Sequence, residues 1–125
     1  MFRAIEHTAI ATPDPEKLAA WYVDILGFRI NHRYGPNVFV RAPDGGVIEL
    51  IPADNGDRPE QRMFQAGIRH LAVTVDDFDA AHQMLQSRGV NFLTEPTNVG
   101  GNRLVFFTDS DGNYLHLVSR PAPLP

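Results

Sequence analysis

The chain has 125 residues, of which 43% are hydrophobic, and a formal net charge of −4. This length and composition are typical of one globular domain with a substantial core, and the acidic balance gives no support to nucleic-acid binding. Because there is no cysteine, disulfides and thiolate chemistry are excluded, and any metal must be held by histidine or carboxylate. No apolar run is long enough to cross a membrane and no signal-peptide pattern is seen, so we expect a cytoplasmic protein.

The first half of the chain predicts one helix and four strands. Alternating residues indicate a strand over residues 3–11. A helix follows, because Asp14 is suited to cap its N-terminus and Gly27 to end it. Three more strands are expected at 28–33, 38–41 and 47–51, the last two joined by a Pro-Asp-Gly-Gly hairpin turn.

The second half repeats this order after a polar connector at residues 53–66. The pattern predicts a strand over 68–75, a helix capped by Asp76 or Asp77, a strand at 90–94 and a loop at 95–102. Two further strands are expected at 104–107 and 114–118. The chain therefore predicts a single domain with module 1 at about 1–52 and module 2 at about 67–120, each a βαβββ unit.

Two stretches of sequence support the repeat directly. Residues 5–10 match 68–73 at an offset of 63, and residues 43–51 match 110–118 at an offset of 67. This alignment pairs His7 with His70 and Glu49 with His116. We expect α+β modules whose helices cover one sheet face, so that the four polar residues look into a cavity enclosed by a curved mixed sheet.

Three imidazoles and one carboxylate suit a borderline divalent metal: zinc, nickel, iron(II), cobalt or manganese. Four protein ligands on a six-coordinate ion leave two positions open. Two open positions can chelate a substrate through adjacent oxygens, which is Lewis-acid catalysis.

The paired modules, these four polar positions and the ending Asp-Gly-Asn-x-x-His-Leu at 111–117 resemble the vicinal oxygen chelate superfamily of glyoxalases, extradiol dioxygenases and bleomycin-resistance proteins. The resemblance spans about residues 2–120. It implies that His7, Glu49, His70 and His116 are metal ligands and that the protein is a homodimer. Relatives usually place Glu at the position of His116, so this site would be more positive and would favour an anionic ligand.

Several other polar residues are expected on strands or loops near the cavity. Arg41 and Arg103 can each hold an anionic group or be surface arginines beside a turn. His32 and His82 have no repeat partner, so we expect His32 to be exposed and His82 to lie at a helix boundary. The expected substrate-binding residues are Arg41, Arg103, Tyr34 and Asn102.

The expected function is a metal-dependent enzyme of glyoxalase type, with lyase or isomerase proton-transfer chemistry on a small molecule. Glu49 is the expected catalytic base, either as a ligand that detaches or as a non-ligand beside a metal held by three histidines. One alternative is an iron(II) extradiol-type dioxygenase, for which His7, His70 and Glu49 supply two histidines and one carboxylate. Another is a metal-free small-molecule-binding or antibiotic-resistance protein, against which the four-residue set argues. No nucleic-acid or membrane partner is expected.

Overall fold

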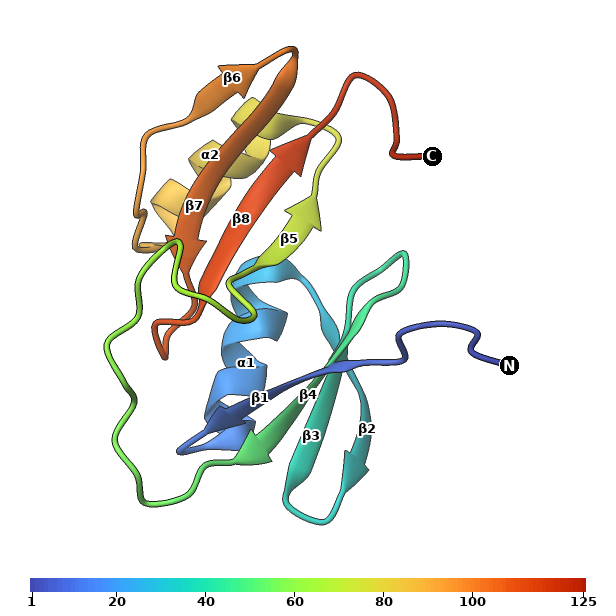
Figure 1. Ribbon diagram of the computed structural model, residues 1–125, viewed down its shortest axis with the longest axis vertical. Helices are drawn as coiled ribbons and strands as arrows, with labels where there is room; N and C mark the ends of the chain where they lie inside the picture. The colour runs from blue at the N-terminus through green and yellow to red at the C-terminus, as the bar shows by residue number, and fades with distance from the viewer. The chain divides into compact units, whose positions relative to one another are not determined.

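The computed structural model describes residues 1–125, and its elements follow the order β-α-β-β-β twice (Figure 1). The chain divides into two compact units, residues 1–59 and residues 60–125, each built from one four-stranded mixed sheet and one helix. The expected fold class, α+β with two βαβββ modules, is confirmed. Neither helix has the length and apolar character that crossing a membrane would require.

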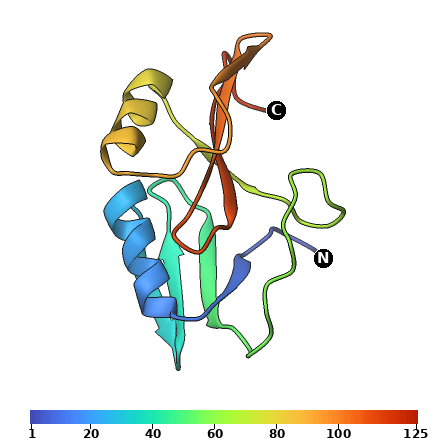
Figure 2. The same cartoon turned by 90° about the vertical axis from the view of Figure 1, so that its left-hand side faces the viewer.

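The first unit has the sheet order β1-β4-β3-β2, in which β1 runs parallel to β4 and the other neighbours are antiparallel. The helix α1 covers one face of this sheet (Figure 2). Alternation along β3 and β4 turns one set of apolar side chains toward the helix and the other set away from it. The elements are β1 (Thr8–Thr12), α1 (Pro15–Leu26), β2 (Arg29–Tyr34), β3 (Asn37–Arg41) and β4 (Val47–Pro52).

Helix α1 begins and ends where the sequence predicts. The side chain of Asp14 accepts a hydrogen bond from the Lys17 backbone N–H at 3.1 Å, which satisfies one of the free donors of the first turn. Gly27 ends the helix at a φ of 72°, a left-handed conformation that glycine adopts without steric cost. The core of the unit consists of Leu18, Ala19, Tyr22, Phe28, Val38, Val40, Ile48 and Leu50.

The second unit has the corresponding order β5-β8-β7-β6, with β5 parallel to β8. Of the two predicted caps, Asp77 is the one used: its side chain accepts from the Ala80 backbone N–H at 3.0 Å. Helix α2 covers one face of this sheet, where Phe78, Leu85, Val105, Phe107, Leu115 and Leu117 are buried. The elements are β5 (Leu71–Thr74), α2 (Phe78–Ser87), β6 (Thr97–Val99), β7 (Asn102–Thr108) and β8 (Tyr114–Ser119).

The segment at 90–102 differs from the prediction of a strand at 90–94 followed by a loop. Only a single bridge, Phe92 to Phe107, forms in the first part, and the strand β6 lies in the predicted loop. The Thr94 hydroxyl, rather than a backbone carbonyl, accepts the Phe106 N–H at 3.1 Å. Pro96 follows and has no N–H to donate, so regular pairing with β7 starts only after it.

Strands β1 and β5 begin later than predicted, at Thr8 and Leu71 instead of residues 3 and 68. Each pairs in parallel with a strand that starts just after a hairpin turn, β4 and β8 respectively. When this register is continued, His7 and His70 lie opposite the first residues of β4 and β8, and the residues before the two histidines lie opposite a turn. His7 and His70 thus occupy equivalent positions, each one residue before its strand.

In both units an arginine on a strand binds an acidic residue in the first turn of the helix. Arg33 makes two hydrogen bonds to the Glu16 carboxylate, at 2.8 and 3.1 Å, which lower the pKa of Glu16. Arg103 contacts Asp79 at 2.8 Å, and the pKa of that carboxyl is lowered for the same reason. These pairs link each helix to its sheet on the helix-covered face.

Candidate functional site

In the first unit, the helix-free face of the sheet carries His7 and Glu49. The His7 Nε2 atom lies 3.9 Å from the Glu49 Oε1 atom, and the two side chains are 33% and 18% exposed. Phe39 lies directly opposite Glu49 on β3, and its ring meets the His7 ring edge-on at 5.8 Å. The pair is thus partly shielded from water by one aromatic side chain.

In the second unit, the corresponding face carries His70 and His116. Their ring centroids are 4.3 Å apart. Phe106 lies directly opposite His116 on β7 and contacts both rings, at 5.3 Å from His70 and 4.8 Å from His116. The second unit therefore repeats the arrangement of the first, with histidine in place of glutamate.

The repeat also includes the two aromatic residues. Phe39 and Phe106 are related by the same offset of 67 that relates Glu49 to His116. The sequence reasoning missed Phe106, although this offset would have found it. Each unit thus supplies a histidine before its first strand and a second possible metal-binding side chain on its last strand. A phenylalanine lies opposite that second residue on the neighbouring strand and contacts the histidine ring.

The segment that leads to His70 is held by polar contacts within the second unit. Arg69 donates to the backbone carbonyl of Arg62 at 2.9 Å. The Tyr114 hydroxyl donates to the Gln61 carbonyl at 3.0 Å, which ties the segment to β8. These contacts fix the approach of the chain to the strand that carries His116.

His116 is in an unusual electrostatic state for a histidine. It is buried, and its Nδ1 atom has no hydrogen-bond partner. Burial lowers the pKa of His116 to about 4, with further contributions from His70 and Arg120. At neutral pH the ring is therefore uncharged, which is the form of histidine that binds a metal ion.

The donor chemistry of the two pairs fits a borderline divalent ion, because three imidazoles and a carboxylate are nitrogen and oxygen ligands. The free Nδ1 of His116 is an unused donor atom in a buried position. Each unit nevertheless brings together only two of the four residues, and no group of three or more His, Asp or Glu side chains is arranged so that it could hold a metal ion. The four-ligand site therefore stays a prediction.

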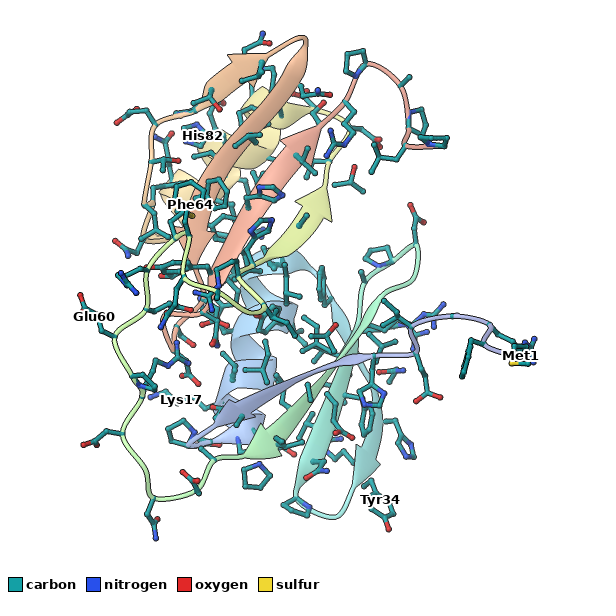
Figure 3. All side chains as sticks on the ribbon, in the orientation of Figure 1. Met1, Lys17, Tyr34, Glu60, Phe64 and His82 are labelled. Atoms are coloured by element: carbon teal, nitrogen blue, oxygen red, sulfur yellow. The ribbon has the colours of Figure 1, made fainter.

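Three of the four residues expected to bind substrate lie on the helix-free faces. Arg41 and Tyr34 share the face of Glu49. The Arg41 side chain is half-buried, whereas Tyr34 lies at the end of β2 and is 74% exposed (Figure 3). Asn102 is half-buried and shares the face of His116, since it alternates with Leu104 and Phe106 along β7.

Arg103 lies on the opposite face of its sheet. Its guanidinium binds Asp79 and lies 4.5 Å from the centre of the Phe78 ring. The structure thus places it in contact with helix α2 and away from the face that carries His116.

The two histidines without a repeat partner are placed differently from one another. His32 is exposed, but its ring lies 5.3 Å from Phe39 on the helix-free face of the first sheet. His82 lies in α2, where its ring stacks on Phe78 at 6.1 Å and meets the Phe92 ring edge-on at 4.8 Å. His32 is thus a neighbour of the His7 and Glu49 pair, whereas His82 packs against apolar rings.

Comparison with known proteins gives a consistent result. Residues 4–117 match the family model of the Glyoxalase/Bleomycin resistance protein/Dioxygenase superfamily. The uncharacterized protein YwkD of Bacillus subtilis is 34% identical over 94% of this chain and 97% of its own length. Human mitochondrial methylmalonyl-CoA epimerase is 29% identical over 86% of this chain and 67% of its own length. A solved superfamily member from Sphaerobacter thermophilus is 27% identical, with a TM-score of 0.75 over 93% of this chain and 97% of that one.

Proposed function

The chain belongs to the Glyoxalase/Bleomycin resistance protein/Dioxygenase superfamily, and on this premise we propose that it is a divalent-metal-dependent enzyme of lyase or isomerase type. Its substrate is a small molecule with two adjacent oxygens. The human relative is named an epimerase, and epimerisation beside a carbonyl group proceeds by proton transfer.

One observation carries the proposal. Each repeat places a histidine and a second metal-binding side chain in contact on the helix-free face of its sheet: His7 with Glu49, and His70 with His116. A single histidine on a strand is commonly a packing residue. Two matching pairs at repeat-related positions are the expected result if both pairs serve one function. We propose that the four residues together bind one metal ion.

The residues of the chain have separate roles in this proposal. A bound divalent ion would supply Lewis-acid polarisation of the substrate oxygens. Glu49 is the only carboxylate of the four, so it is the base that accepts the proton from carbon and returns it, and it would leave the ion to do so. Phe39 and Phe106 exclude water beside the two pairs, which strengthens electrostatic interactions with the substrate.

The test is metal binding by protein purified without chelator, followed by elemental analysis and calorimetric titration with zinc, nickel and cobalt. His70→Ala is expected to abolish binding, because it removes one donor and leaves His116 without its partner. The matched control is His82→Ala, which removes a histidine that packs against apolar rings. Unchanged affinity in His70→Ala, or no bound metal in the wild type, would show that the proposed site is wrong.

A mixing experiment distinguishes four ligands from one chain from ligands shared by two copies in a homodimer, which is the assembly we propose. His7→Ala and His70→Ala are unfolded together and refolded as a mixture. If two chains share each site, about a quarter of the sites regain all four ligands, because half of the dimers are mixed and each mixed dimer has one intact site. If each site belongs to one chain, no binding returns.

A further inference from the structure

The pairing of β2 with β3 places two arginines directly opposite each other. Arg29 is the register partner of Arg41 at the start of β2. The next pair, Ile30 with Val40, turns toward helix α1, so Arg29 and Arg41 both point to the helix-free face. Opposite residues of an antiparallel pair have Cβ atoms about 5 Å apart, so both guanidiniums can reach one small group.

These two arginines differ from the arginines on the other faces of the sheets. Arg33 and Arg103 are each neutralised by a carboxylate of the helix that they face. Neither Arg29 nor Arg41 has a carboxylate within 4.0 Å, and Arg41 is half-buried. Like charges directly opposite each other destabilise a sheet unless a counter-charge lies between them.

We propose that Arg29 and Arg41 form a two-arginine clamp for the oxyanion group of the substrate, with a phosphate group as the preferred form. Two guanidiniums offer paired N–H donors and two positive charges, which match a phosphate dianion. Of these two arginines, only Arg41 is identified from the sequence. Arg29 is identified by strand register, which no periodicity in the sequence reveals.

The clamp lies on the same face as the proposed reaction centre. Arg41 is two residues from Phe39, which is directly opposite Glu49. Two residues along a strand span about 7 Å, so the anion and the reacting oxygens would belong to one small molecule. This assignment of the substrate class rests on the proposed function, but binding of the anion does not require the metal.

The test uses metal-free, full-length protein with chelator present, titrated with inorganic phosphate at constant ionic strength while the melting temperature is followed. We expect a saturable rise in the wild type and about tenfold weaker binding in Arg29→Gln and in Arg41→Gln, because each loses one charge-assisted contact. The matched control, Arg3→Gln, removes an exposed arginine outside the sheets and should bind phosphate as the wild type does.

Without phosphate, Arg29→Gln and Arg41→Gln should melt at or above the wild-type temperature, because each removes the repulsion between like charges.

An acetate titration distinguishes the two possible oxyanions of the substrate. Tighter phosphate binding supports a phosphate-bearing substrate, and tighter acetate binding overturns that preference in favour of a carboxylate. Absence of saturable binding by either, or equal binding in both glutamine variants and the wild type, would overturn the clamp. His70→Ala should keep phosphate binding, so failure of the metal site and failure of the clamp give different results.

Discussion

Replacing Asp109 tests how the turn before β8 positions His116. Asp109 is 4% exposed, and one of its carboxylate oxygens accepts the backbone N–H groups of Asp111 and Asn113 at 2.9 and 3.0 Å. The other accepts the Asn113 side-chain amide at 2.8 Å. These three hydrogen bonds close the turn that ends at Asn113, and β8, which carries His116, starts at the next residue.

The magnitude follows from these bonds and from the first unit, where alanine occupies the related position. Ala42 makes the same two backbone bonds, N–H to Gly46 and carbonyl to Gly45, that Asp109 makes to Asn113 and Gly112. The turn therefore closes without the carboxylate, and Asp109→Ala loses only the side-chain bonds. Each bond to a charged group contributes about 1.5 kcal/mol or more, and the three are not additive, so the expected loss is about 3 kcal/mol. Asp109→Asn keeps one acceptor oxygen and should lose about 1 kcal/mol.

Urea denaturation of the metal-free variants measures this loss. With a slope of about 2 kcal/mol per molar urea, Asp109→Ala should lower the midpoint by about 1.5 M and Asp109→Asn by about 0.5 M. Metal affinity measured on the folded variants reports whether His116 is still held in place. A midpoint within about 0.3 M of the wild type for Asp109→Ala would refute the reasoning, because it corresponds to less than one hydrogen bond. An equal loss in both variants would show that charge matters rather than the acceptor geometry.

Two further predictions concern the buried histidine and the end of α1. Because the pKa of His116 is lowered to about 4, the unfolded chain takes up a proton at this residue near pH 6.5 and the folded chain does so only near pH 4. The free energy of unfolding of the metal-free protein should therefore fall by roughly 2–3 kcal/mol as the pH drops through this window. Urea midpoints measured across the window check this, and in the His116→Asn variant the part of the fall that is due to His116 should be missing. Gly27→Ala should cost about 1 kcal/mol, because the position has a φ of 72° although space around it is open. A cost near zero in urea denaturation would mean that the helix end rearranges.

Much of the fold is determined by local sequence. Asp14, Gly27 and Asp77 cap or end the helices through bonds to residues a few positions away, so their roles can be recognised without knowledge of the fold. The repeat made His7 equivalent to His70 and Glu49 equivalent to His116. The structure brings His7 next to Glu49 in the first unit and His70 next to His116 in the second. That each pair lies on the helix-free face followed from strand periodicity and from the apolar side that the helices cover.

Strand pairing decided what the sequence alone left open. The late starts of β1 and β5 depend on where β4 and β8 begin, and the failure of residues 90–94 to form a strand depends on their contacts with β7. Register also placed Arg103 against α2 and Arg29 opposite Arg41. The physical reason is that hydrogen bonding between strands joins residues distant in sequence, and a shift of one residue moves a side chain to the other face. Sequence periodicity describes each strand singly, so only the tertiary structure shows which side chains share a face across strands.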